Sequence, residues 1–156
     1  MKLHKSKIKS TELSNASRGK SFEEETCQLL KALGFIAHNC KNDGLSGQPC
    51  DIIAMHLPVG MLLDCKRVER GTKFYFKNIE DNQYICFKYA PIYNNVHYCG
   101  FVIKLDETGQ VYYLPAHLVI ALGEDWRRGN VDCTQLQLFN KVASAWRKEY
   151  ESKNQQ

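Results

Sequence analysis

Two acidic residues and a lysine interrupt apolar segments in the middle of the chain. The segment Cys50-Asp51-Ile52-Ile53 carries Asp51, and the segment Leu62-Leu63-Asp64-Cys65-Lys66 carries Asp64 and Lys66. Short apolar runs of this kind are typical of buried strands, in which a charge is costly unless it is paired or binds a metal. Alternate residues of a strand share a face, so Asp64 and Lys66 are expected on the same side of the sheet.

The register of the two strands decides whether Asp51 meets this pair. We assume a two-residue loop flanked by Leu57 and Gly60. An antiparallel pair then places Asp51 opposite Lys66 and diagonal to Asp64, on one face. A change of one residue in the loop would place the groups on opposite faces, so the assignment depends on the loop.

Paired carboxylates beside a lysine suit a hard divalent cation such as Mg²⁺, with Mn²⁺ as a possible substitute. Carboxylate and carbonyl oxygens would bind the cation, and the lysine could orient a water molecule or steady a phosphate. The alternative is a buried structural ion pair between Asp51 and Lys66. The strand pattern alone leaves both interpretations open.

The first element expected to position these groups is a helix. Ser21 and Glu24 fit a capping box at its start, and Gly34 is suited to its end. Glu23 lies at the edge of the apolar stripe of this helix. Acids at positions 23–25 would also complement the helix dipole, which is the simpler interpretation for at least two of them.

The remaining periodicity predicts a mixed sheet with further helices. A second helix that begins near residues 78–81 and runs to about residue 93 has the apolar set Ile85, Tyr89 and Ile92, with Gln83 on its surface. The other expected elements are strands over residues 35–38, 98–105 and 110–114 and helices over residues 116–122 and 135–150. This order predicts an α/β sandwich around a mixed sheet.

Composition indicates one globular domain of 156 residues, with 44% hydrophobic and 24% charged residues. No segment is long and apolar enough to cross a membrane, and the N-terminus lacks a secretory signal, so we expect no membrane association and a cytoplasmic protein. The seven cysteines form no C-x-x-C pair. They are expected to be free thiols in a reducing compartment rather than disulfides or a zinc site.

The basic excess lies at the N-terminus, where residues 1–20 hold six Lys and Arg against one Glu. Residues 1–17 are predicted to be a flexible basic arm, residues 18–150 a single domain and residues 151–156 a polar tail. Such an arm suits phosphate binding, although basic tails also serve as solubilising ends. The sequence Trp126-Arg127-Arg128 is a second candidate for phosphate contact, or else a solvated turn.

The spacing of the acids resembles a known signature. Asp51, followed 13 residues later by Asp64-Cys65-Lys66, resembles the PD-(D/E)-x-K nucleases. Further segments resemble the RecU-type Holliday junction resolvases in the order of that family. They are Arg18-Gly19-Lys20-Ser21-Phe22-Glu23, Phe76-Lys77-Asn78-Ile79 with Gln83, Gly100-Phe101-Val102-Ile103, and Tyr112-Tyr113-Leu114.

The resemblance implies a restriction-endonuclease-like α/β/α sandwich with a central mixed sheet, and residues 18–150 as a single nuclease domain. It implies a homodimeric, Mg²⁺-dependent endonuclease that acts on branched DNA and resolves four-way junctions by paired nicks in recombination and repair. The implied metal positions are Glu23, Asp51 and Asp64, with Lys66 as the catalytic lysine and Gln83 as a further site residue. The implied DNA-binding residues are Arg18, Lys20, Lys77 and Lys9.

The chain departs from the family at two points. The second acid is Asp rather than the usual Glu, and full-length bacterial members carry a long insertion where this chain has only residues 39–49. A phage-encoded or trimmed relative would fit, in a bacterial or phage-infected cell. Two alternatives are a nuclease of the same fold that acts on duplex, flap or damaged DNA, and a non-catalytic DNA-binding recombination accessory protein.

Overall fold

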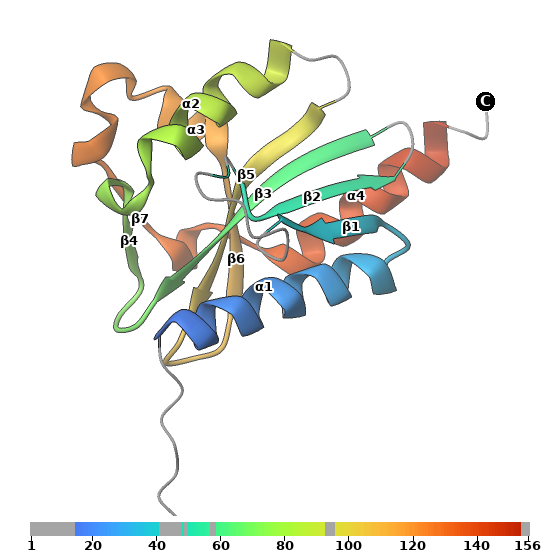
Figure 1. Ribbon diagram of the computed structural model, residues 1–156, viewed down its shortest axis with the longest axis horizontal. Coiled ribbons are helices and arrows are strands. Elements are labelled where there is room, and N and C mark those ends of the chain that lie inside the picture. Colours follow the sequence, from blue (N-terminus) through green and yellow to red (C-terminus); the bar gives the residue numbers. More distant parts are fainter. Residues whose placement is uncertain (1–14, 41–47, 49, 57–58, 93–95, 154–156) are drawn as a thin grey trace, which may run out of the picture.

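The computed structural model describes residues 15–40, 48, 50–56, 59–92 and 96–153. A six-stranded sheet in the order β1-β2-β3-β5-β6-β8 forms its centre (Figure 1). Its strands are β1 (Ile36–Asn39), β2 (Ile52–His56), β3 (Val59–Val68), β5 (Val96–Leu105), β6 (Val111–Pro115) and β8 (Gln137–Leu138). Only β3 and β5 pair in parallel among these strands, so the predicted mixed sheet is confirmed.

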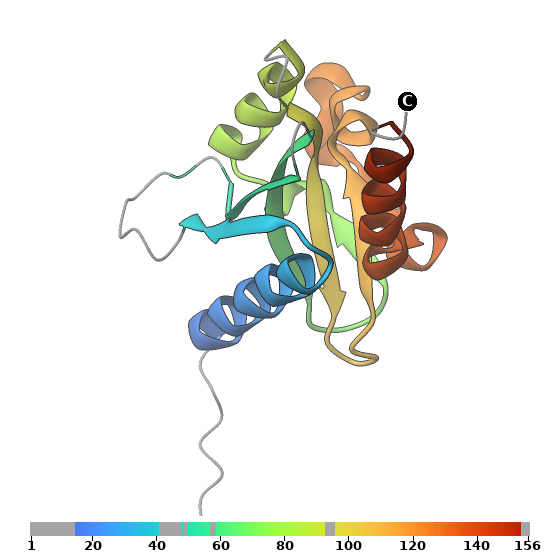
Figure 2. The ribbon, with the colours of Figure 1, turned by 90° about the vertical axis from the view of Figure 1, so that its right-hand side faces the viewer.

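Helices cover both faces of the sheet. The α-helices are α1 (Asn15–Ala32), α2 (Asp81–Tyr89), α3 (Ala116–Ile120) and α4 (Phe139–Lys153). The first core lies between α1, α4 and one face, and the second lies between α2, α3 and the other face. Figure 2 shows α4 and α2 on opposite sides of the strands. The predicted three-layer sandwich is therefore confirmed, and no described helix is long and apolar enough to cross a membrane.

Smaller elements complete the layer around α2. A two-stranded sheet pairs β4 (Lys73–Tyr75) with β7 (Asn130–Asp132). The 3-10 helices are η2 (Phe76–Asn78), η3 (Ala90–Ile92), η4 (Gly123–Arg128) and η5 (Cys133–Gln135). The strand β7 and the segment β8 were not predicted, because segments of two or three residues carry no readable periodicity. Helix α4 accordingly begins at Phe139 rather than at residue 135, and it extends to Lys153, into the segment expected as a polar tail.

Helix α1 begins earlier than the sequence indicated. It starts at Asn15, so Ser21 and Glu24 lie inside it and the predicted capping box is wrong. Residues 15–20 add no apolar stripe, which is why periodicity did not reveal them. The predicted end at Gly34 is confirmed: its φ is +91°, and its N–H donates to the carbonyl of Lys31 at 2.9 Å.

Helix α2 turns a different face to the core from the one predicted. Ile85 and Tyr89 are 54% and 50% exposed, whereas Gln83 and Phe87 are buried. Phe87 packs edge-on against Phe101 of β5, with ring centroids 5.1 Å apart. The predicted apolar face is wrong because Gln83 is buried through hydrogen bonds that a hydrophobicity pattern does not record.

The described cysteines are free thiols, as predicted. Four of them are buried, at positions 27, 40, 50 and 133. Of the predicted arm, residues 15–17 belong to α1 and residues 1–14 lie outside the described residues. The arm and the domain limits therefore stay predictions.

Gly100 gives a direct test of the packing between β5 and β6. A Cβ at this position would lie 2.5 Å from the carbonyl oxygen of Leu114 and 2.9 Å from the side chain of Tyr113. We expect Gly100→Ala to lower the free energy of unfolding by about 1–3 kcal/mol, because the contact includes backbone that has little room to move. Urea unfolding measures this. Lys148→Ala, at an exposed position on α4, is the control, and equal midpoints for both variants would contradict the described packing.

Candidate active site

Asp64 lies in the middle of β3 with none of its surface exposed. Its Oδ1 accepts a hydrogen bond from Gln83 Nε2 at 2.8 Å, and its Oδ2 lies 2.9 Å from Lys66 Nζ. Lys66 Nζ also donates to Gln83 Oε1 at 2.8 Å. The three side chains therefore form a closed polar triangle between β3 and α2, and they place Asp64 and Lys66 on one face as predicted.

Asp51 lies at the bend just before β2. Ile52 pairs with Leu63 in the antiparallel β2–β3 register, so Asp51 comes next to Asp64. The predicted pairing of Asp51 with Lys66 is wrong by two residues. The strands pair as far as His56 and Val59, and the loop residues between them lie outside the described residues. A shift of two keeps the side chains on the same face, so the carboxylates still meet.

The main chain of β3 holds Asp51 in place. Asp51 Oδ2 accepts a hydrogen bond from the Cys65 N–H at 2.8 Å, and the Asp51 N–H donates to the carbonyl of Leu63 at 3.1 Å. The ion pair of Lys66 is with Asp64, whereas the sequence had suggested Asp51 as its partner. The hydrogen bond from the Cys65 N–H was not predicted from the sequence. Every residue except proline has a backbone N–H, so the residue type does not reveal which one acts as a donor.

The electrostatics of Asp64 reflect this arrangement. Burial raises the pKa of the Asp64 carboxyl, Lys66 opposes the rise, and the nearby Asp51 carboxylate adds to it, with a net increase to about 7. Two adjacent carboxylates in a buried site disfavour being charged together. A cation bound between them would relieve this repulsion.

Glu23, the third predicted acid, is buried on α1 with 1% of its surface exposed. Burial, together with the charges of Asp51, Asp64 and Glu23, raises the pKa of the Cys65 thiol, so all three acids lie in the surroundings of Cys65. Among the described residues, no three His, Cys, Asp or Glu side chains converge into a ready metal site. The two carboxylates that lie next to each other are those of Asp51 and Asp64. A role for Glu23 as a third metal ligand stays a prediction.

The neighbours of Glu23 have other partners. All three acids at positions 23–25 lie well inside α1, so the interpretation as first-turn acids is wrong. Glu24 accepts a hydrogen bond from Gln28, and Glu25 forms an ion pair with Lys104 at 2.9 Å.

The donor set fits a hard divalent cation. Asp51 and Asp64 offer carboxylate oxygens, and burial together with the neighbouring Asp51 raises the pKa of Asp64. Mg²⁺ prefers one or two carboxylates, with water and substrate phosphate in its remaining positions. These residues therefore suit Mg²⁺ chemically.

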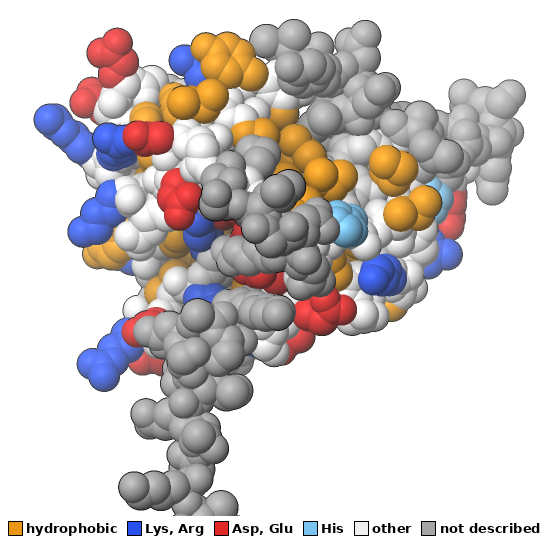
Figure 3. Space-filling view, viewed as in Figure 1, with side chains coloured by type: hydrophobic (Ala, Val, Ile, Leu, Met, Phe, Trp, Pro, Cys, Tyr) orange, Lys and Arg blue, Asp and Glu red, His pale blue; other side chains and the backbone are white. Residues whose placement is uncertain are grey.

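Lys77, one of the predicted DNA-binding residues, is exposed on η2, with its Nζ 5.7 Å from the ring centroid of Tyr75. Arg18 and Lys20 belong to α1, and Lys9 lies outside the described residues. Figure 3 shows several Lys and Arg side chains along the left edge of the face that carries η2 and η4.

The segment Trp126-Arg127-Arg128 forms part of η4. Trp126 is buried and stacks on Tyr84 of α2, with ring centroids 4.4 Å apart. Arg127 pairs with Asp81 at the start of α2, and Arg128 is exposed. Trp126 is therefore a packing residue rather than part of a solvated turn.

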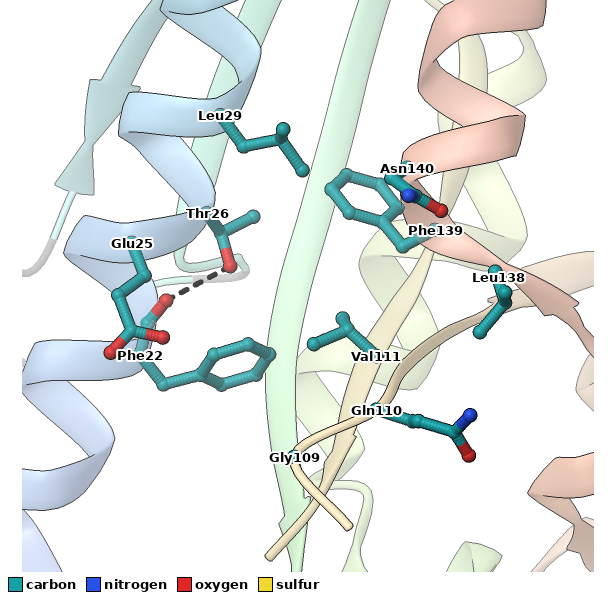
Figure 4. Close-up of a pocket in the computed structure, with 10 residues that line it drawn as sticks. All are labelled: Phe22, Glu25, Thr26, Leu29, Gly109, Gln110, Val111, Leu138, Phe139 and Asn140. Atoms are coloured by element: carbon teal, nitrogen blue, oxygen red, sulfur yellow. Dashed lines mark hydrogen bonds between the residues drawn. The ribbon is translucent and has the colours of Figure 1, made fainter.

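A separate cavity of about 390 Å³ lies on the other face of the sheet, between α1, α4 and the start of β6 (Figure 4). Its wall includes Phe22, Leu29, Val111 and Phe139. None of the predicted site residues lines it, so it is not part of the candidate active site.

The mixed sheet with helices on both faces is the restriction-endonuclease-like fold, as predicted. The solved structure of Hjc, a Holliday junction resolvase from the archaeal hyperthermophile Archaeoglobus fulgidus, is similar to this chain, with a TM-score of 0.58 and 19% sequence identity. The match covers 81% of this chain and 98% of that chain. No family model and no curated protein sequence matches the chain.

The raised pKa of Asp64 gives a pH-dependent test. The folded pKa of about 7 lies above the ordinary value of 3.8, so the protonated carboxyl stabilises the fold at low pH, and this contribution is lost as the pH rises through about 7. Asp64→Asn lacks the charged form. Relative to this variant, the metal-free wild-type protein should lose thermal stability between about pH 4 and about pH 7.

Thermal unfolding of both proteins with and without Mg²⁺ measures this difference. Mg²⁺ should raise the melting temperature of the wild-type protein at the higher pH and leave Asp64→Asn almost unchanged. Equal stabilisation of both proteins by Mg²⁺ would contradict a cation site at Asp64.

Proposed function

We propose that the protein is a Mg²⁺-dependent, structure-selective DNA endonuclease that resolves four-way junctions by paired nicks in DNA recombination and repair. It would act as a homodimer in the cytoplasm of a bacterial or phage-infected cell. The observation that carries the proposal is the buried triangle of Asp64, Lys66 and Gln83 beside Asp51. This arrangement lies on a fold that the chain shares with a Holliday junction resolvase.

Asp51 and Asp64 would hold Mg²⁺, which when bound stabilises negative charge on the reacting phosphate and makes water more acidic. Lys66 keeps its ammonium group at a fixed position through Asp64 and Gln83. From there it can orient the attacking water or contact a phosphate oxygen as negative charge develops. Gln83 ties the lysine and the carboxylate together, so their spacing is set before DNA binds.

The length of the match supports a junction as the substrate. Hjc is a Holliday junction resolvase, and 98% of its chain is covered by this one. Nearly the whole Hjc chain therefore aligns with secondary-structure elements of this protein. The short segment at residues 39–49 is then compatible with junction cleavage, although full-length bacterial RecU-type resolvases carry a long insertion at that place.

Cleavage assays with labelled four-way junction, linear duplex and flap DNA separate the proposal from its alternatives. We expect Mg²⁺-dependent paired nicks in the junction and much slower cleavage of the duplex. Cleavage of duplex at the same rate would favour a general nuclease of the same fold. No cleavage of any substrate, with DNA binding intact, would favour a recombination accessory protein.

Asp64→Asn tests the site within the same assay. We expect cleavage to fall by at least about a hundredfold while junction binding persists, because the variant removes a charge that acts during chemistry. Asp106→Asn is the matched control, since Asp106 pairs with Arg67 outside the candidate site. Undiminished cleavage by Asp64→Asn would refute the site.

The N-terminal residues are tested by a deletion that spares α1. Removing residues 2–14 takes away four lysines, including Lys9. If these lysines neutralise DNA phosphates, the slope of log affinity against log salt should become shallower by about 0.9 for each phosphate that is no longer neutralised. Junction binding measured at several salt concentrations gives the slope, and an unchanged slope would assign the arm another role.

A further inference from the structure

Three consecutive residues in the first turn of α2 contact three separate parts of the chain. Asp81 pairs with Arg127 of η4. Gln83 bonds to Asp64 and Lys66. Between them, Asn82 Nδ2 donates a hydrogen bond to the backbone carbonyl of Gln48 at 3.1 Å. Neither Asn82 nor Gln48 has a part in the chemistry proposed above.

The contact of Asn82 leads to Asp51 through a continuous series of hydrogen bonds. The side-chain amide of Gln48 donates to the carbonyl of Cys40. The Cys40 N–H in turn donates to the carbonyl of Asp51 at 2.8 Å. Cys40 and Asp51 are buried, so these polar groups depend on their protein partners.

Asp51 needs this support because it lies at a bend outside β2. On its β3 side, Leu63 and Cys65 hold it through the backbone. On its other side, the described bonds run through Cys40 to Gln48. This second set links the main chain of Asp51 to a part of the protein outside β3.

We propose that Asn82 is a positioning residue that, through Gln48 and Cys40, fixes the Asp51 carboxylate relative to Asp64. Its neighbour Gln83 fixes Asp64 and Lys66, so the first turn of α2 sets the geometry of both halves of the site. The role assigned to Asp51 rests on the proposed function. The expected consequence is on cation affinity, because a cation held by two carboxylates is sensitive to their separation.

The test measures Mg²⁺ binding by isothermal titration calorimetry with the full-length protein and no DNA. Asn82→Ala should raise the dissociation constant for Mg²⁺ about tenfold, the lower end of the effect of removing a group that orients metal ligands. Asn82→Gln retains an amide donor and should recover part of the affinity. Asn140→Ala, at an exposed position on α4, is the matched control and should bind as the wild-type protein does.

A double-mutant cycle with Gln48→Ala tests whether the two residues act in series. If they do, the double variant should bind Mg²⁺ no more weakly than the weaker single variant. Fully additive losses would overturn the series. Unfolding of the metal-free variants separates positioning from stability: a lower melting temperature with unchanged Mg²⁺ affinity would overturn the proposal.

Mg²⁺ binding, taken together with the cleavage assay, separates this proposal from the proposed function. If the wild-type protein binds Mg²⁺ and Asn82→Ala binds it as tightly, the positioning role fails while the nuclease proposal stands. If Asn82→Ala weakens Mg²⁺ binding but wild-type protein cleaves no DNA, the positioning role stands and the nuclease proposal fails.

Discussion

A carboxylate buried in the central strand is the constraint on which the rest of this site depends. Asp64 has no exposed surface, and a lone charge there would be strongly unfavourable. Lys66 and Gln83 offset that cost by contacting both carboxylate oxygens. Asp51 acts in the opposite direction and raises the pKa of Asp64. Asp64 therefore combines burial with two specific charged neighbours and a perturbed pKa, which makes it a candidate functional residue.

The fold supplies each partner from a different element. The alternation of β3 sends Leu63 into the core beneath α1 and turns Asp64 toward α2. The parallel pairing of β3 with β5 puts this strand inside the sheet, where water is excluded. Helix α2 then covers the face with Phe87 packed on Phe101, which brings Gln83 over the carboxylate. Packing of apolar residues thus fixes the position of polar ones.

The sequence predicted the parts of this arrangement that depend on local pattern. The order of elements, the hairpin of β5 and β6 and the shared face of Asp64 and Lys66 follow from alternation and turn residues. The contacts made in three dimensions were harder to predict. The β2–β3 register differed by two residues because it depends on the loop, and Gln83 was placed on the surface because its burial depends on partners 17 and 19 residues away. Resemblance of motifs, rather than hydrophobicity, assigned Gln83 to the site.

The decisive experiment is a crystal structure of the protein with a four-way DNA junction and Ca²⁺, a hard cation that takes oxygen ligands as Mg²⁺ does. We expect one cation in each of two copies, bound by Asp51 and Asp64, with a junction phosphate beside Lys66. A twofold axis should relate the two sites on one DNA-facing side. DNA bound on the α4 face, or a cation bound away from both carboxylates, would contradict a nuclease site at Asp51 and Asp64.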